Sequence, residues 1–443
     1  MHYQCLINIK IVQSVQPDFH APSTLRDYVI EIPYVVDYNV ESGWEELTQK
    51  LKLSIPKRIK VKVTSSQNPT APAKYLWLGG TADSSNIGGF SSTPLIMRGD
   101  RITFNVGYRA RCKDGIEYTY MTGKQIVVGG VVTDSIPPLF DGYVTSVQTK
   151  YPLTIEAEDM MFVLKQIPTP SKSWGKMSIQ DIVRSIIATN GSSALNRYGA
   201  NPIISDFNAT TQTFNVGSLQ THGETLAQFL GRIKHQYKQD SWFRGNELRI
   251  GVTHYLPQDL VNHAFKFTKN IISDKLVWKR KDDVILSCVV KSYYLEQATG
   301  STKDGHDKYV TKFKEILVYV NNSGNFAFME KQKGQEFPPQ EQGERYTMLI
   351  YADITKNKPQ DVNWLFYMGK EYLKRFYYDG LRGSFLTFGI PYVKHGDSVT
   401  LVDPNMPERN GTYMVRRVEY NGGVEDGLRQ EIFIDFRVDQ VNL

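Results

Sequence analysis

Short runs in which apolar and polar residues alternate fill both ends of the chain and constrain its fold most. Examples are YVIEIPYVV (28–36) and IKVKV (59–63) near the start, and SFLTFGIPYV, HGDSVTLVD, GTYMVRRVEYNG and LRQEIFIDFRV after residue 380. Alternation with a period of two places one face of a strand in the core and the other in solvent. The sequence therefore predicts a mainly β protein of the α+β class, with β structure in the first and last thirds.

The middle of the chain has a helical period instead. Residues 177–191 place apolar side chains at helical spacing, with Ser178 as the expected N-cap and Asn190-Gly191 as the end. Residues 224–239 predict a second amphipathic helix, followed by a hairpin that turns at Gly245-Asn246. We expect a small α/β region inserted between two β regions.

These patterns divide the chain into three units, which suits 443 residues. We expect a first β region over 1–165, an α/β insert over 166–275, and a second β region over 276–443 with a helix at about 360–380. Two long loops are expected, at 66–96 and at 296–309, the first because it is rich in Ser, Gly, Pro and Asn.

The two β regions share one turn. Gly99-Asp100 and Gly396-Asp397 each open an alternating strand, where glycine supplies a positive φ and the aspartate caps the turn. Each turn is followed by a strand with a glycine close to an aromatic residue, Gly142-Tyr143 in the first region and Gly411-Thr412-Tyr413 in the second. The order of the elements around these turns indicates an internal duplication.

Charge, cysteine and hydropathy patterns exclude several classes of protein. The 52 Lys and Arg exceed the 46 Asp and Glu by only six charges, too few for a dedicated DNA-binding protein. Cys5, Cys112 and Cys288 are far apart, which argues against a disulfide scaffold and favours buried or half-buried thiols. No run reaches the ~18 apolar residues of a membrane helix. The start does not read as a signal peptide, so we expect synthesis in a cytoplasm and no export by the usual leader.

Seven segments in order carry a family resemblance: GWEELTQKLKLSIPK (43–57), MRGDRITFNVGY (97–108), LFDGYVTSV (139–147), LTIEAEDMMFVLKQ (153–166), WFRGNELRIG (242–251), HGDSVTLVD (395–403) and GTYMVRRVEYNGGVEDGLRQEIFIDFRV (411–438). In them the chain resembles the baseplate hub family of contractile phage tails and related injection systems. That family includes hubs of the late-control-protein-D type, the hub of Mu-like phages and the N-terminal half of type VI secretion spike proteins. The loops 66–96 and 296–309 depart from the family pattern.

The resemblance implies that the β regions 1–165 and 276–443 are a first and a second tube-like β-barrel domain. It also implies a homotrimeric ring whose six barrels mimic one ring of the hexameric tail tube. It implies the tail tube protein above, the central spike protein below and other baseplate or tail proteins as partners, with DNA passing through the lumen without specific binding. The hub would initiate the tube in the bacterial host cytoplasm and remain in the virion tail baseplate or tip, or in an injection particle. From motif position we expect structural or interface roles for Trp44, Gly99, Asp100, Gly142, Tyr143, Glu158, Asp159, Gly396, Asp397, Gly411, Tyr413 and Arg429.

Little in the sequence predicts catalysis. The cluster Glu156-Ala157-Glu158-Asp159 could supply two carboxylates for glycoside hydrolysis, but a strand end followed by Asp159 as a helix N-cap explains it more simply. The eight histidines are scattered and form no H-E-x-x-H pattern. We therefore expect no enzyme activity, no catalytic residue, no metal and no cofactor.

Two further patterns leave alternatives open. The basic run 275–281, KLVWKRK, could bind nucleic acid, although a solvated strand face or a subunit surface is more common. Tyr367, Tyr372, Tyr377 and Tyr378 could form a sugar platform, although packing against a barrel or at an interface is favoured. The alternatives to a hub are a tail-tip cell-wall-degrading enzyme or its carrier, and a receptor- or glycan-binding tip module.

Overall fold

The computed structural model describes residues 2–438 except 15–27, 57–58, 79–94, 112–116, 124, 129–130, 149–150, 175–176, 207–218, 238, 252–259, 284–285, 302–306, 341–342, 352–360 and 425–426. Strands make up 52% of the structure and helices 16%, so the predicted mainly β class is confirmed. Within the described part of the chain, no helix has the length and apolar character needed to cross a membrane. Part of the expected loop 66–96 therefore lies outside the described residues, as does Cys112.

The N-terminal β unit comprises β1 (His2–Val12), β2 (Tyr28–Ile32), β3 (Asp37–Gly43), β4 (Lys50–Ile55), β5 (Ile59–Ser65), β6 (Lys74–Leu78), β7 (Arg101–Arg111), β8 (Glu117–Met121), β11 (Phe140–Gln148) and β12 (Leu153–Glu158). A separate hairpin joins β9 (Gln125–Val128) to β10 (Val131–Ser135). Neighbours follow the order β6–β5–β2–β1–β7–β11–β12–β4–β3, and all these pairs are antiparallel. The predicted alternation holds, since Val61 and Val63 of β5 are buried and the lysines between them are not.

The C-terminal β unit comprises β18 (Asn262–Lys266), β19 (Ile271–Asp274), β20 (Val277–Lys279), β25 (Gly380–Phe388), β26 (Ser398–Val402), β27 (Gly411–Gly423) and β28 (Gly427–Arg437), with short 3-10 turns at Lys281–Asp283 and Pro407–Arg409. Neighbours follow the order β18–β26–β27–β28–β25. Strands β19 and β20 pair one after the other with the remaining edge of β25. Only the β18–β26 pair is parallel among these described strands.

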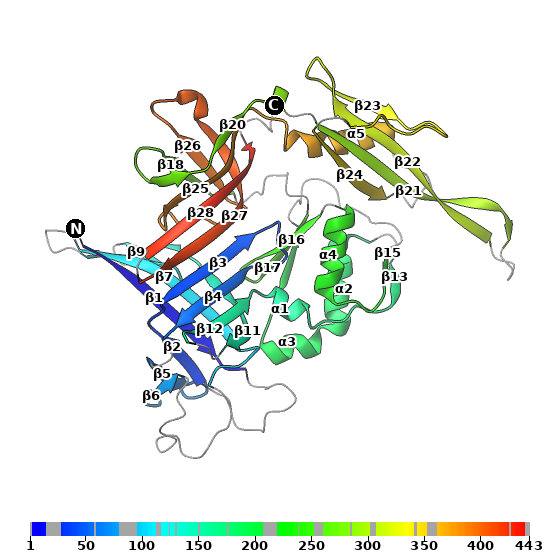
Figure 1. Ribbon diagram of the computed structural model, residues 1–443. Helices are drawn as coiled ribbons and strands as arrows, with labels where there is room; N and C mark the ends of the chain where they lie inside the picture. The colour runs from blue at the N-terminus through cyan, green and yellow to red at the C-terminus, as the bar shows by residue number, and fades with distance from the viewer. Residues whose placement is uncertain are drawn as a thin grey trace.

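Strand β27 joins the two β units (Figure 1). One edge of β27 pairs with β28, and the opposite edge pairs first with β26 and then with β3. In the second pairing, residues Arg417–Gly423 lie antiparallel to Asp37–Gly43. The described strands of both units thus form one sheet of 17 strands over a common apolar core.

The α/β unit lies beside this sheet. It contains α1 (Met161–Leu164), β13 (Lys172–Trp174), α2 (Ile179–Asn190), α3 (Ser192–Tyr198), β14 (Ile203–Asp206), β15 (Leu219–Thr221), α4 (Leu226–Tyr237), β16 (Asp240–Arg244) and β17 (Glu247–Gly251). The predicted N-cap is confirmed, because the Ser178 hydroxyl accepts the Asp181 N–H at 3.1 Å. In α4 the buried residues Leu226, Phe229, Leu230 and Ile233 follow helical spacing and face the unit's own core.

The β21–β24 unit projects from the other end of the sheet (Figure 1). Its strands β21 (Leu286–Ser301), β22 (Asp307–Val320), β23 (Phe326–Glu330) and β24 (Glu344–Tyr351) follow the order β23–β22–β21–β24. Helix α5 (Val362–Lys374) packs on this sheet through Leu365, Met368 and Leu373. The predicted helix thus ends earlier than residue 380, because Tyr378 turns into the core of the large sheet and β25 begins at Gly380.

The strand partners divide the chain differently from the expected ranges. Residues 262–279 pair within the C-terminal β unit, although the α/β insert was expected to reach 275. Residues 286–374 have a sheet and a core of their own inside the range expected for the second barrel. The expected loop 296–309 is mostly hairpin, with β21 reaching Ser301 and β22 beginning at Asp307. Alternation identifies a strand but not its partner, which explains these differences.

Candidate functional site

The two Gly-Asp turns form the same hydrogen-bonded corner. The glycine φ angles are +88° at Gly99 and +83° at Gly396, the left-handed region that favours glycine. In each corner the glycine N–H donates to a valine carbonyl on the next strand, and the N–H of that valine donates back to the aspartate carbonyl. The residues are Gly99, Asp100 and Val144 in the first corner (2.8 and 2.9 Å) and Gly396, Asp397 and Val415 in the second (2.8 and 2.9 Å).

The strands around the two corners repeat as well. The order β3–β4–β12–β11–β7 in the N-terminal unit matches β19/β20–β25–β28–β27–β26 in the C-terminal unit, in the same chain order and with every pair antiparallel. Each unit has a β-bulge one residue after the corner valine, at Thr145 and at Arg416. The internal duplication predicted from the sequence is present in the structure.

The glycine–aromatic pairs, in contrast, do not correspond. When Val144 is matched to Val415, Gly142 occupies the position of Tyr413, and Gly411 matches the phenylalanine that opens β11. A Cβ on Gly142 would lie 2.1 Å from the Glu158 carbonyl oxygen, so close strand packing requires glycine there. The similar glycine–aromatic pattern of the two sequence segments is therefore a coincidence.

The two tyrosines of those pairs are buried in different cores. Tyr143 packs in the α/β unit, with its ring centroid 5.7 Å from those of Phe162 and Tyr198. Tyr413 packs in the core of the large sheet, where its hydroxyl accepts the Leu381 N–H at 3.0 Å. Tyr143 thus lies at the contact between the first β unit and the α/β unit, and Tyr413 lies inside the second β unit.

The two corner carboxylates share one role and differ in another. Each accepts a backbone N–H three residues earlier, Asp100 from Met97 at 2.8 Å and Asp397 from Lys394 at 2.9 Å. Asp100 also accepts the Ser14 N–H at 2.9 Å. Asp397 instead lies 3.1 Å from the guanidinium of Arg244 and 3.1 Å from Nε2 of His263.

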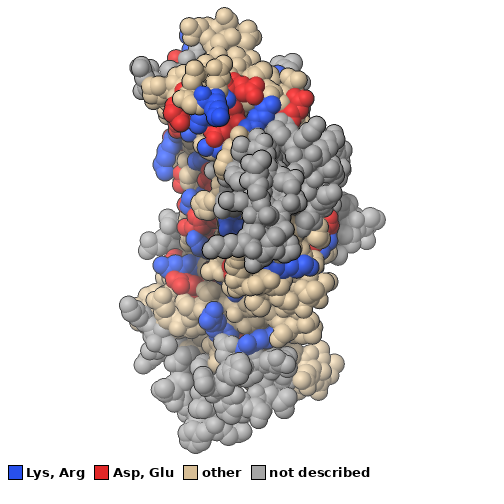
Figure 2. Space-filling view, turned by 90° about the vertical axis from the view of Figure 1, so that its right-hand side faces the viewer, with Lys and Arg blue, Asp and Glu red and all other residues tan. Residues whose placement is uncertain are grey.

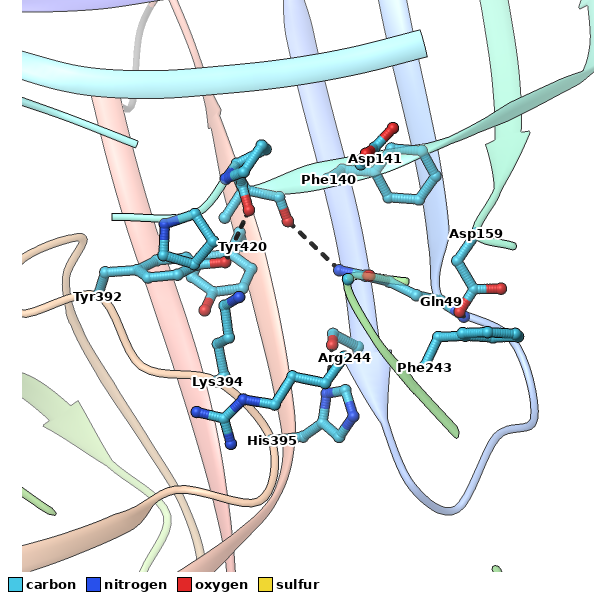
Figure 3. Close-up of a pocket in the computed structure, with 15 residues that line it drawn as sticks. Gln49, Phe140, Asp141, Asp159, Phe243, Arg244, Tyr392, Lys394, His395 and Tyr420 are labelled. Carbon is cyan, nitrogen blue, oxygen red and sulfur yellow. Dashed lines mark hydrogen bonds between the residues drawn. The ribbon is translucent and has the colours of Figure 1, made fainter. Parts of the chain in front are cut away.

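A small cavity of about 70 Å³ lies beside the second corner, where three units meet (Figure 3). The N-terminal β unit contributes Ser42 and Gln49, and the α/β unit contributes Phe243 and Arg244. The C-terminal unit contributes Tyr392, Lys394, His395 and Tyr420. Figure 3 shows Arg244, Lys394 and His395 clustered on one side and Gln49 and Asp159 on the other. The volume suits a few water molecules and is too small for a sugar.

Burial controls the charge of this cavity. Burial lowers the pKa of His395 to about 3, helped by the positive charges of Arg244 and Lys394, so its imidazole is neutral. Its Nδ1 lies 2.5 Å from the Ser42 hydroxyl. Burial also lowers the pKa of Lys394 to about 8, with Arg244 adding to the effect. The cavity thus holds neutral and cationic groups beside the carboxylate of Asp397.

Glu158 and Asp159 hold the end of β12. Asp159 is buried, and its carboxylate accepts the N–H groups of Gln49 and Met161, each at 3.0 Å. Burial raises its pKa to about 7 against the lowering effect of these two hydrogen bonds. Glu158 pairs with Lys165 at 2.6 Å. The N-cap position of α1 is Met160, one residue after the predicted Asp159, but the Asp159 side chain still caps the N–H of Met161. Asp159 thereby links the helix start to the loop before β4.

Trp44 lies at the contact between the two β units, and Arg429 lies on a phenylalanine of its own unit. Trp44 is buried, and its backbone N–H donates to the Arg416 carbonyl at 3.2 Å. Its ring centroid lies 6.2 Å from that of Trp242. The Arg429 guanidinium lies 4.9 Å from the ring centroid of Phe388. Trp44 therefore lies at the end of the contact between β3 and β27, while Arg429 packs on its own sheet.

The structure does not bring the acidic cluster together as a catalytic pair. The carboxylate of Glu156 accepts the Ser146 hydroxyl at 2.9 Å, Glu158 pairs with Lys165, and Asp159 is a buried cap. Among the described residues, no group of three or more His, Cys, Asp or Glu has metal-ligand geometry. The cysteine prediction is met for Cys288, which is buried, and for Cys5, which is half-buried.

The Tyr-rich segment and the basic run have different surroundings. Tyr372 and Tyr378 are buried, and Tyr377 packs against Phe326 at 5.6 Å between ring centroids, which favours the packing interpretation over a sugar platform. In the basic run, Val277 and Trp278 are exposed on β20. This run is an edge strand of the large sheet.

Sequence reasoning missed Arg244, His263 and His395 as partners in one cluster. His395 stood beside the Gly396-Asp397 turn, and this was the available signal. The other two come from β16 and β18, more than 130 residues before Asp397, and only the fold brings them to it.

No protein-family model matches the chain, and no curated protein matches it in sequence. Among solved structures, it is similar to a tail protein from Neisseria meningitidis, with 10% identity, 97% of this chain and 96% of that chain covered, and a TM-score of 0.50. It is also similar to the 43 kDa tail protein of prophage MuSo2 from Shewanella oneidensis, with 11% identity, 99% of both chains covered and a TM-score of 0.47. An Escherichia coli component of the type VI secretion system gives 7% identity, 98% and 77% coverage and a TM-score of 0.43.

The likeness to the Neisseria protein extends over nearly the full length of both chains. At 10% identity it is a likeness of fold. The mainly β fold that the family resemblance implied is therefore confirmed: this chain shares the β-rich fold of tail proteins.

Proposed function

We propose that the chain is a structural hub of a phage tail or related injection apparatus. The observation that carries the proposal is the repeat of five strands, a Gly-Asp corner and a bulge, joined in one chain by the β3–β27 pairing. A chain with two equivalent β units offers two equivalent positions in a ring. Three copies would then supply six positions, which matches a sixfold tube above to a threefold spike below.

The surface charge is compatible with a lumen that DNA crosses without specific binding. Figure 2 shows one face on which Lys and Arg are interspersed with Asp and Glu, and both signs gather at the upper end of this view. Ion pairs on the β21–β24 unit, such as Lys314–Glu330 at 3.5 Å and Lys291–Glu315 at 3.4 Å, mix the two signs in the same way. A wall without a continuous basic stripe would not retain the phosphate backbone.

The mass of the native assembly tests the hub proposal. Purified protein at micromolar concentration should have three times the mass of one chain by light scattering and native mass spectrometry. Negative-stain class averages of the same sample should show a ring with a central opening. A chain that stays monomeric at all concentrations, and also in the presence of its tube and spike proteins, contradicts the proposal.

One observation favours a glycan- or receptor-binding tip as a second candidate. Tyr75 and Trp77 of β6 are 67% and 47% exposed, and such aromatic rings can stack on sugars. Binding to host cells or to wall glycans that is lost in Trp77→Ala, with an unchanged oligomeric state, would support this candidate.

A zymogram with purified protein tests the wall-degrading alternative.

A further inference from the structure

The junction between the two β units of one chain is a template for a junction between chains. Within the chain, β27 of the C-terminal unit continues beyond its bulge and pairs with β3 of the N-terminal unit. This pairing covers Ser42, which is 6% exposed, and Trp44, which is 1% exposed. A strand edge left open would expose unpaired backbone groups, so covering it stabilises the sheet.

The strand registers show which residues repeat this junction. The corners and bulges align β27 with β11, so that Arg417 matches Ser146. The same registers carried across the sheet align β3 with β19–β20, so that Val40 matches Leu276. Both Val40 and Leu276 are buried in the core of the large sheet, as this alignment requires.

The β19–β20 strand is the counterpart of β3, but no described strand of the same chain covers it as β27 covers β3. Ile272, Val277 and Trp278 are 43%, 56% and 37% exposed, whereas Ser42, the match of Trp278, is buried under β27. Exposed apolar side chains on an outer strand indicate a strand that is covered in an assembly. One edge of this strand pairs with β25, and no pairing of the described strands uses the other edge.

The segment of β11 after its bulge is the counterpart of the part of β27 that covers β3. Ser146, Val147 and Gln148 pair with β12 on one edge. The opposite edge of these three residues lies beyond the end of β7 and takes part in none of the described pairings. The N-terminal unit thus presents a covering strand, and the C-terminal unit presents a strand to be covered.

We propose that β11 of one copy pairs antiparallel with β19–β20 of a second copy of this chain. The register copied from β27–β3 places Ser146 opposite Lys279, Val147 opposite Trp278 and Gln148 opposite Val277. Val147 and Trp278 then form an apolar cross-strand pair. The contact is head-to-tail, so each copy uses both edges and the assembly closes into a ring when the rotation between copies permits it.

A cysteine pair tests this register. The Trp44 N–H to Arg416 carbonyl bond makes residues 44 and 416 a hydrogen-bonded pair, so residues 41 and 419 form a pair without hydrogen bonds. Their counterparts are Val277 and Gln148, both exposed, and their Cα atoms would be about 4.5 Å apart, close enough for a disulfide. Mixing the single variants Gln148→Cys and Val277→Cys should give a disulfide-linked dimer that neither variant forms alone.

The double variant Gln148→Cys/Val277→Cys should give a covalent ring on a non-reducing gel, whose mass counts the copies. Gln148→Cys/Tyr75→Cys is the matched control, because Tyr75 is exposed on another outer strand of the same sheet and should not cross-link. Val277→Asp should weaken assembly at least tenfold in concentration, whereas Tyr75→Asp should leave it unchanged.

The inference rests on the proposed hub function, and the outcomes separate the two. A trimer by mass that does not cross-link between residues 148 and 277 overturns the strand pairing and leaves the hub function standing. Equal cross-linking in the Tyr75 control also overturns the pairing. Protein that stays monomeric, oxidised or reduced, alone or with tube and spike proteins, overturns both.

Discussion

At the scale of single residues, Asp100 and Asp397 show how a duplicated position acquires a second role. Both cap a turn, but Asp397 also neutralises Arg244 and contacts His263 from a different unit. The capping role can be predicted from a Gly-Asp pair before an alternating strand. The second depends on residues brought together by the fold, which a turn pattern cannot predict.

Asp397→Ala should therefore cost about 3 kcal/mol of unfolding free energy, because it leaves the largely buried Arg244 without its carboxylate. Asp141→Ala is the matched control: it removes an ion pair with Arg101 whose side chains are 45% and 31% exposed, and should cost under about 1 kcal/mol. Urea unfolding of both variants measures the difference. Equal losses would show that the Asp397 contact does not join the units energetically.

The neutral His395 predicts a pH dependence. Its pKa is about 3 in the folded protein and 6.5 in an ordinary environment, so only the unfolded chain takes up this proton between these values. This contribution to stability is complete above pH 6.5 and is lost as the pH falls, by about 1.4 kcal/mol per pH unit. Asp159, with its pKa raised to about 7, acts in the opposite direction from about pH 4 to 7.

A comparison with His395→Gln isolates the histidine from Asp159. From pH 6.5 down to pH 5, the free energy of unfolding of the wild type should fall relative to that of the variant, as measured by urea titrations at several pH values. Parallel pH profiles for the two proteins would mean that His395 is protonated in the folded state.

At the scale of elements, two glycines inside helices should respond oppositely to alanine. A Cβ on Gly369 of α5 would lie 2.7 and 2.8 Å from the methyl carbons of Val318 and Val290, so Gly369→Ala should destabilise the protein by about 1–3 kcal/mol through overpacking. A Cβ on Gly231 of α4 would contact only the end of the Leu47 side chain at 3.3 Å. Gly231→Ala should therefore be neutral or stabilise by up to about 1 kcal/mol.

Thermal unfolding of the two alanine variants gives the sign of each change. A gain of stability in Gly369→Ala would show that α5 does not pack closely on β21 and β22.

The elements were the part of the fold most accessible from sequence, and the reason is local. The N-cap at Ser178, the turn at Gly245-Asn246 and the alternation in β5 depend on neighbouring residues alone. Pairing across the sheet depends instead on residues far apart in the sequence. The assignment of 262–279 to the C-terminal unit was therefore not predictable. For the same reason the sequence wrongly matched Gly142 with Gly411. Only the hydrogen bonds of the corners fix the register, and these join distant residues.

At the scale of the whole molecule, the β21–β24 unit is an insertion into a hairpin. The last residue of β20, Lys279, pairs directly with Gly380, the first residue of β25. Replacing residues 284–376 by a short Gly-Ser linker should therefore leave the large sheet folded. The deletion also needs Asp435→Asn, because Arg375, the ion-pair partner of Asp435, is removed.

This shortened protein should unfold in one cooperative urea transition and keep its strand signal in circular dichroism. The same deletion without Asp435→Asn is the control and should be less stable, because it leaves a poorly solvated carboxylate unpaired. An aggregated or molten product in both cases would show that the large sheet depends on the β21–β24 unit.

The β3–β27 pairing also dictates when folding can finish. Residues 37–43 leave the ribosome long before their partners, 417–423, are synthesised. Until then the nascent chain carries an open strand edge that can capture the wrong partner, including the same edge of another nascent chain. Contacts this distant in sequence form slowly. The sheet can therefore close only after translation has passed residue 423, because β3 has no partner for its second edge before then.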